Sequence, residues 1–96
     1  MVGLWCYNKL MKDLEKMYKA LANRRRLTAI KFLRAKREAS VGEIAEHLKL
    51  SFKSTSRHIA VLRNADIVEK EQRGLLAFYS LSSDVHPIIK QLLSMV

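Results

Sequence analysis

The chain has 96 residues, of which 49% are hydrophobic, with three Gly and one Pro, and this predicts one compact, largely helical domain over residues 1–96. No run approaches the roughly 20 apolar residues of a membrane span, and the opening residues are too interrupted for a secretory signal, so we expect a cytoplasmic protein without a membrane partner. A net charge of +9 favours a polyanionic partner, with nucleic acid preferred over an anionic membrane surface. A single cysteine, Cys6, excludes an internal disulfide and a cysteine-rich zinc site.

Two helices are predicted at the start of the chain. Over residues 7–21 the apolar side chains recur at three- and four-residue steps; they are Tyr7, Leu10, Met11, Leu14, Met17, Tyr18 and Leu21. Leu4 and Trp5 either extend this helix or pack as a leading arm. Asn23 is suited to cap a second helix over residues 24–36, with Leu27, Ile30 and Leu33 on its inner face.

A helix-turn-helix pattern follows. Ser40 and Glu43 have the spacing of a capping box, in which each side chain bonds the other residue's backbone N–H. They open a short helix, and the turn at Lys49 and Leu50 leads to Ser51, which can cap the next one. Two short helices joined by a tight turn are typical of DNA-binding proteins.

The helix over residues 51–65 has two chemically different faces. Four residues form a mostly apolar stripe that can dock on a core; they are Phe52, Thr55, Ile59 and Leu62. The opposite row holds Lys53, Ser54, Arg57, Val61 and Asn64. A basic, hydroxyl-rich row on a docked helix suits the DNA major groove, although a simply solvated face has the same composition.

After residue 66 the pattern alternates, which predicts strands over residues 67–72 and 75–81. Arg73 and Gly74 lie between them, where glycine supplies the positive φ of a tight hairpin. We interpret this segment, 67–81, as a basic wing. Ser82 or Ser83 is expected to cap a final helix with Pro87 in its first turn, giving four helices, two strands and a last helix.

The order and the motifs resemble the ArsR family of winged helix-turn-helix repressors over nearly the whole chain. Three sets of residues carry the resemblance: Ala20-Leu21-Ala22 with Arg26-Leu27, then Ser51 with Ser56-Arg57-His58-Ile59 and Val61-Leu62-Arg63, and finally Gln72-Arg73-Gly74 with Tyr79-Ser80-Leu81. The resemblance implies a mainly helical winged helix-turn-helix fold with a small β-hairpin, and a dimeric DNA-binding regulator, a repressor that blocks promoter access.

The chain departs from the family at both of its metal sites. Ser40-Val41-Gly42 stands where thiolate sensors carry Cys-Val-Cys, and Cys6 alone cannot supply a soft-metal site. Asp84 and His86 match half of a second site whose other half is missing. We therefore expect no cofactor. Asp84 and His86 are the only metal candidates, and the alternative is that Asp84 favours a helix N-terminus while His86 is exposed. For the unidentified effector the alternatives are redox chemistry at Cys6, a small molecule, or no signal at all.

The resemblance also implies the site residues. Base edges would be read by Lys53, Ser54 and Arg57, and phosphates bound by Ser56, His58 and Arg63. Phe52 stands where the family commonly has a polar residue, and it would be either an extra docking contact or an apolar contact with a thymine methyl. Arg73 and Gly74 would bring the wing to the minor groove. Six residues are predicted to form the dimer interface: Leu10, Leu14, Met17, Ile88, Ile89 and Leu92. The alternatives are a non-specific architectural or RNA-binding winged helix, or a protein-interaction module. We expect no enzymatic activity, since no nucleophile–base motif, carboxylate pair or phosphate loop is visible.

Overall fold

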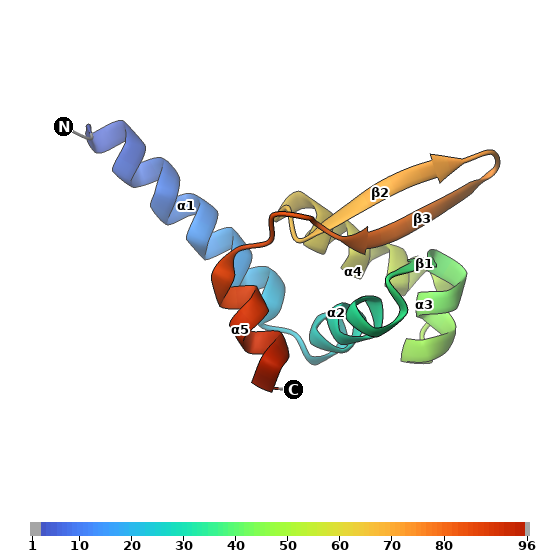
Figure 1. Cartoon of the computed structure of the whole chain (residues 1–96). Helices are drawn as coiled ribbons and strands as arrows, with labels where there is room; N and C mark the ends of the chain where they lie inside the picture. The colour runs from blue at the N-terminus through green and yellow to red at the C-terminus, as the bar shows by residue number, and fades with distance from the viewer. Residues whose placement is uncertain (1–2, 96) are drawn as a thin grey trace.

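A computed structural model describes residues 3–95 of the chain. The elements follow the order α1 (Leu4–Leu21), α2 (Arg24–Lys36), β1 (Glu38–Ser40), α3 (Val41–Leu48), α4 (Phe52–Asn64), β2 (Val68–Arg73), β3 (Leu76–Leu81) and α5 (Pro87–Met95) (Figure 1). The predicted helices and hairpin are confirmed, and α1 does include Leu4 and Trp5. No helix among the described residues is long and apolar enough to cross a membrane.

The sheet has a third strand that we did not predict. Its order is β1-β3-β2, all antiparallel, and β1 pairs Ala39 with Tyr79 of β3. β1 has only three residues between two helices, too few to show an alternating pattern in the sequence. Its strand conformation depends on pairing with β3. The hairpin tip is Gly74-Leu75, with Arg73 paired to Leu76. Gly74 has φ +62° and Leu75 is not among the residues with positive φ, as a type II′ turn requires.

The caps begin the helices as the sequence suggests, except for the last one. The Asn23 side chain accepts N–H bonds from Arg25 and Arg26, and the capping box of Ser40 and Glu43 is complete. Ser51 Oγ accepts from Ser54 N at 3.1 Å. These bonds satisfy N–H groups that a first helical turn leaves without partners.

The predicted cap of α5 by Ser82 or Ser83 is wrong. Helix α5 begins at Pro87, and His86 Nδ1 accepts the N–H of Ile88 at 3.1 Å. Proline favours the first helical position because its φ is preset and it has no N–H to satisfy. The residue before it, His86, therefore takes the capping position.

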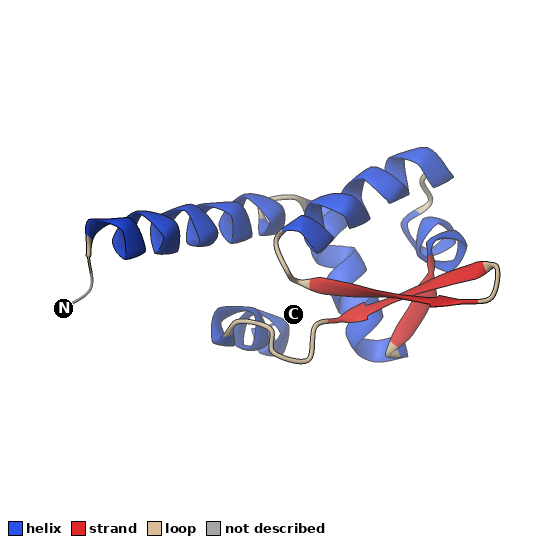
Figure 2. Cartoon of the chain, turned by 90° about the horizontal axis from the view of Figure 1, so that it is seen from above, coloured by secondary structure: helices blue, strands red, loops and turns tan. Residues whose placement is uncertain are grey.

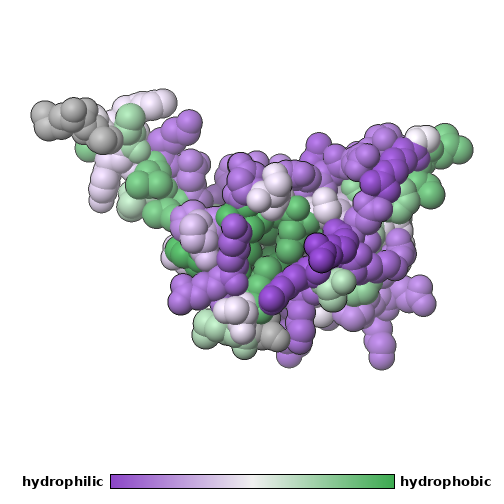
Figure 3. All heavy atoms as spheres, in the orientation of Figure 1, coloured by the Kyte–Doolittle hydropathy of each residue, from purple (hydrophilic) through white to green (hydrophobic). Residues whose placement is uncertain are grey.

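Helix α1 projects from the body as a rod in both views of the chain (Figures 1 and 2). The radius of gyration is 14.3 Å, whereas a compact chain of this length has about 12.5 Å. Hydrophobic side chains lie on the surface along α1 and at the hairpin tip (Figure 3). The molecule thus extends two partly apolar arms beyond its core.

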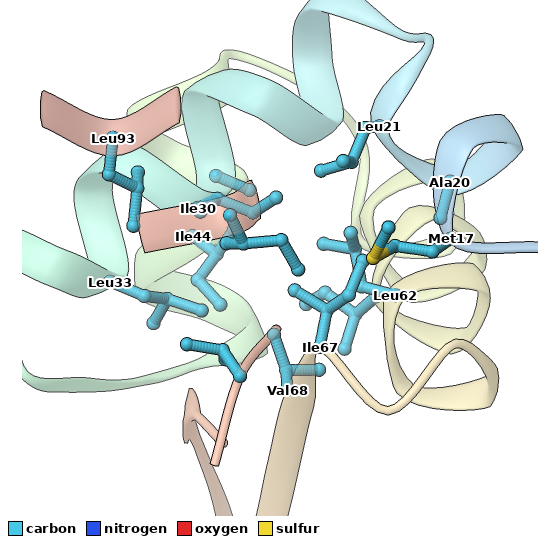
Figure 4. Close-up of a cluster of buried hydrophobic side chains, with 14 of the residues drawn as sticks. Met17, Ala20, Leu21, Ile30, Leu33, Ile44, Leu62, Ile67, Val68 and Leu93 are labelled. Carbon is cyan, nitrogen blue, oxygen red and sulfur yellow. The ribbon is translucent and has the colours of Figure 1, made fainter. Parts of the chain in front are cut away.

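The core lies where the helices meet the base of the hairpin (Figure 4). Its largest fully buried side chains are Ile30, Leu33, Ile44, Leu62, Ile67, Ile89 and Thr55. Phe52 does not dock here, since 64% of its surface is exposed. The core covers α4 only from Thr55 onward, and Phe52 lies in the first turn before that point. The docking role is therefore wrong for Phe52, and the contact with a thymine methyl stays a prediction.

Candidate nucleic-acid interface

The outer row of α4 is positively charged and available for contact. Lys53 and Arg57 are exposed, and within residues 3–95 neither side chain has a hydrogen bond or an ion pair. Ser54 is half-buried beside them. Thr55, Ile59 and Leu62 are buried on the opposite face, so the helix is fixed by its core side while the predicted base-reading residues face outward.

All the charged residues of α4 are positive. Lys53, Arg57 and Arg63 are its charged residues and it has no Asp or Glu, which gives a net charge of +3 with His58 neutral. Arg63 is exposed near its end, and Ser56 is half-buried. A helix of this kind can approach phosphates without acidic residues that oppose the contact.

His58 is held by an arginine from another helix. Arg26 Nη1 lies 3.3 Å from His58 Nδ1, and the same guanidinium donates to two carbonyls at the end of α1, with Nε 2.6 Å from Ala20 O and Nη2 3.0 Å from Lys19 O. Because arginine only donates, Nδ1 must accept, which requires neutral His58. Burial first, and then the charges of Arg26 and Arg25, lower the pKa of His58.

This role of Arg26 was missed from the sequence. Its carbonyl partners end the preceding helix, and His58 is 32 residues away. No local period or cap signal marks such a contact. Arg26 therefore joins the end of α1 to the middle of α4.

The wing is not basic, contrary to our interpretation. Between residues 67 and 81, Lys70 and Arg73 are balanced by Glu69 and Glu71. Arg73 Nη1 and Nη2 donate to the two carboxylate oxygens of Glu38 at 2.7 and 2.8 Å. Nη2 also lies 2.9 Å from Glu71 Oε2.

These contacts fix Arg73 against the sheet. Its guanidinium carbon lies 4.9 Å from the centre of the Phe78 ring. The paired carboxylates raise the pKa of Arg73, and the same hydrogen bond lowers the pKa of Glu38. Arg73 thus links β2 to β1, and a DNA phosphate would have to compete with two carboxylates for it.

The predicted dimer residues divide into exposed and buried groups. Leu10 is 55% exposed, whereas Met17 and Ile89 are 6% and 2% exposed and belong to the chain's own core. Leu14, Ile88 and Leu92 are partly buried at the core's edge. Met17 and Ile89 have little surface left for a partner. The exposed apolar side chains of α1 extend further toward its start, through Leu4, Trp5 and Tyr7.

The metal candidates do not form a cluster. Within the described residues no group of three or more His, Cys, Asp or Glu side chains is placed to hold an ion. His86 uses Nδ1 to cap α5, and Asp84 is exposed. Cys6 is exposed on α1.

Comparison with known proteins identifies the family. The family described as "Bacterial regulatory protein, arsR family" matches residues 23–70, which run from the cap of α2 into β2. The transcriptional activator HlyU of Vibrio cholerae serotype O1 is 40% identical over 67 residues, 70% of this chain and 61% of that protein. The matched stretch therefore spans less than two thirds of that relative. The transcriptional repressor SdpR of Bacillus subtilis is 29% identical over 69 residues, 72% of this chain and 76% of that protein.

A solved structure supports the same assignment. The homodimeric winged helix-turn-helix DNA-binding domain Mb0332 from Mycobacterium bovis superimposes with a TM-score of 0.79 at 25% identity, covering 93% of this chain and 79% of that one. The expected family, fold class and absence of an enzyme activity are thereby confirmed. The chain belongs to the arsR family of bacterial regulatory proteins and is a DNA-binding winged helix-turn-helix transcriptional regulator.

Proposed function

We propose that the protein is a homodimeric, sequence-specific regulator that represses transcription by covering a promoter. The charge of α4 carries this proposal: the helix has three cationic side chains, two of them in its outer row, and no acidic one, and it is fixed by a buried opposite face. Lys53, Ser54 and Arg57 would read base edges in the major groove, while Ser56 and Arg63 would bind phosphate. His58 would join them through Nε2–H, the donor that remains on a neutral imidazole whose Nδ1 accepts from Arg26. A regulator that acts on bacterial DNA in this way works in the cytoplasm.

The surface of α1 supports the dimer. Leu4, Trp5, Tyr7 and Leu10 are exposed on a helix that projects beyond the core, and pairing α1 and α5 across a two-fold axis would remove them from water. Leu10, Leu14, Ile88 and Leu92 are the interface residues with surface to contribute. Such a dimer would present two α4 helices about 34 Å apart, the spacing of successive major grooves.

The ion pairs of the wing limit its contribution to DNA affinity. Because Arg73 is bound to Glu38 and Glu71, we assign the wing a lesser part in affinity than α4. The turn at Gly74 brings the backbone of the hairpin tip, and the exposed Leu75 beside it, to the flanking DNA.

Two measurements test the function. The mass in solution should be twice that of the chain, and a stable monomer would contradict the two-fold arrangement. A duplex selected from a random pool should bind at least about a thousandfold more tightly than random duplex, with affinity falling steeply as salt rises because bound phosphates release counterions. Equal affinity for both duplexes, or a preference for RNA, would point to an architectural or RNA-binding protein.

The regulatory sign needs a separate experiment, because one relative is an activator and another a repressor. Transcription in vitro from a promoter that contains the selected site should fall as the protein is added. An increase would replace repression by activation and leave the DNA-binding role intact.

A further inference from the structure

A groove of about 440 Å³ lies between α1 and the C-terminal end of α4. Its α1 wall carries Lys12, Lys16 and Lys19, which recur at steps of four and three and so share one face of that helix. Val61 and Asn64 form the α4 wall. The two helices pack directly against each other, so the groove is a fixed feature of the fold.

The groove carries a positive charge that the chain itself does not balance. Lys12, Lys16, Lys19 and Arg26 line it together with one acid, Glu15, giving a net charge of +3. Glu15 lies 2.8 Å from Lys19 Nζ, and Arg26 uses its donors within the fold. Lys12 and Lys16 are the groove cations whose side chains have neither a carboxylate partner nor a hydrogen bond within residues 3–95.

The groove continues the reading face of α4. Lys53, Arg57, Val61 and Asn64 follow one another at steps of four, four and three, so they form one row along that helix. The last two members of this row form the wall of the groove. A polyanion that extends along the whole row would therefore reach the groove and its Lys12 and Lys16. An open, charged channel of this kind suits an extended backbone better than an apolar partner.

We propose that Lys12 and Lys16 of α1 bind DNA phosphates next to the bases that α4 reads. The inference rests on the proposed function. In the two-fold dimer α1 lies at the symmetry axis, so these phosphates would be those between the two half-sites. The helix that joins the two protomers would then also hold the centre of the operator.

The first test removes the two unpaired cations. The variant K12Q/K16Q keeps good helix formers at exposed positions, and a dimer loses four phosphate contacts. The slope of log affinity against log salt should become shallower by about 4. Binding near 0.15 M salt should weaken by about tenfold or more, equally for operator and random duplex.

The matched control is K31Q/K90Q, which removes the same charge from α2 and α5 outside the groove. Its salt slope should stay close to that of the unaltered protein. Equal slopes for the two double variants would mean that only net charge matters, and this would overturn the proposal. An unchanged slope in K12Q/K16Q would do the same.

A second test predicts a gain, which misfolding cannot mimic. Glu15→Gln removes the one acid of the groove, and Lys19 is released to the DNA. Affinity for both duplexes should rise severalfold with a steeper salt slope. Asp13→Asn makes the same charge change on the same helix but lines a different cavity, against α5, and should give a smaller gain.

The outcomes separate this inference from the function on which it rests. If the unaltered protein prefers no duplex, both proposals fail. If it binds an operator and Glu15→Gln gains no more than Asp13→Asn, the groove is not a phosphate site, while the role of α4 remains.

Discussion

Helix α4 and the β2–β3 hairpin carry their charges in opposite ways. The helix has a net charge of +3 with no acidic residue, whereas the hairpin has two cations and two acids. Lys53 and Arg57 extend from α4 without partners inside the described chain, while Arg73 is bound by Glu38 and Glu71. Cations without internal partners are available to DNA, and paired ones hold a fold together. The same residue type thus has different tasks in the two regions.

The largest expected effect is on the α4 side of this comparison. Arg57→Ala should weaken binding to a selected operator by about 10- to 100-fold, since a good side-chain pair to a base edge contributes roughly 1–3 kcal/mol of discrimination. Binding to random duplex should fall much less. Titrations of both duplexes at one salt concentration measure the ratio, and equal losses would make Arg57 a phosphate contact instead of a base reader.

A substitution on the buried face of α4 should change the free energy of unfolding and not the DNA affinity. Thr55 is fully buried, and its hydroxyl has no hydrogen-bond partner among the described residues. Thr55→Val removes that hydroxyl from the core, so the free energy of unfolding should rise by about 1 kcal/mol. Urea denaturation measures it. A less stable variant would show that the hydroxyl has a partner after all.

The hairpin turn gives the matching test in the wing. Gly74 has φ +62° with no atom within 4 Å of an added Cβ, so Gly74→Ala adds backbone strain without a clash. We expect a loss of about 1 kcal/mol in the free energy of unfolding. Gly74→Asn should lose less because Asn tolerates this conformation. Equal midpoints of urea unfolding for Gly74→Ala and the unaltered protein would contradict the assigned turn.

Removing the carboxylate partner of Arg73 should make this cation of the wing available to DNA, as Lys53 and Arg57 of α4 are. Glu38→Gln removes the carboxylate that binds Arg73 at both nitrogens, so affinity for random duplex should rise a few-fold with a steeper salt slope. The gain should disappear in E38Q/R73A. If it persists there, it comes from the lost acid alone and Arg73 has no part in it.

The smallest effect concerns the link between α4 and α1. Burial, and then Arg26 and Arg25, lower the pKa of His58 in the fold. As pH falls, the His58 imidazole is therefore protonated in the unfolded chain at a higher pH than in the folded one. The stability due to His58 is complete above its ordinary pKa near 6.5 and is lost as pH falls through the lowered value in the fold. In His58→Gln, unfolding free energies compared at pH 7.5 and pH 5 should differ less than in the unaltered protein.

Much of the fold could be predicted because helix periods, caps and tight turns depend on nearby residues. Asn23, Ser40, Ser51 and Gly74 each act within a few positions, and the structure has all four in their predicted roles. One cap signal failed because a second signal competed with it: Pro87 moved the start of α5 past Ser82 and Ser83.

The sequence by itself therefore determined the five helices, the β2–β3 hairpin, their order and the row of α4 that faces outward. Only the tertiary structure decided which side chains are available. Arg73 meets Glu38 across 35 residues, Arg26 reaches His58 across 32, and β1 forms against β3. Met17 and Ile89 lie in the core while Phe52 does not. An amphipathic period tells which side of a helix is apolar, but the contacts of that side depend on residues distant in the chain.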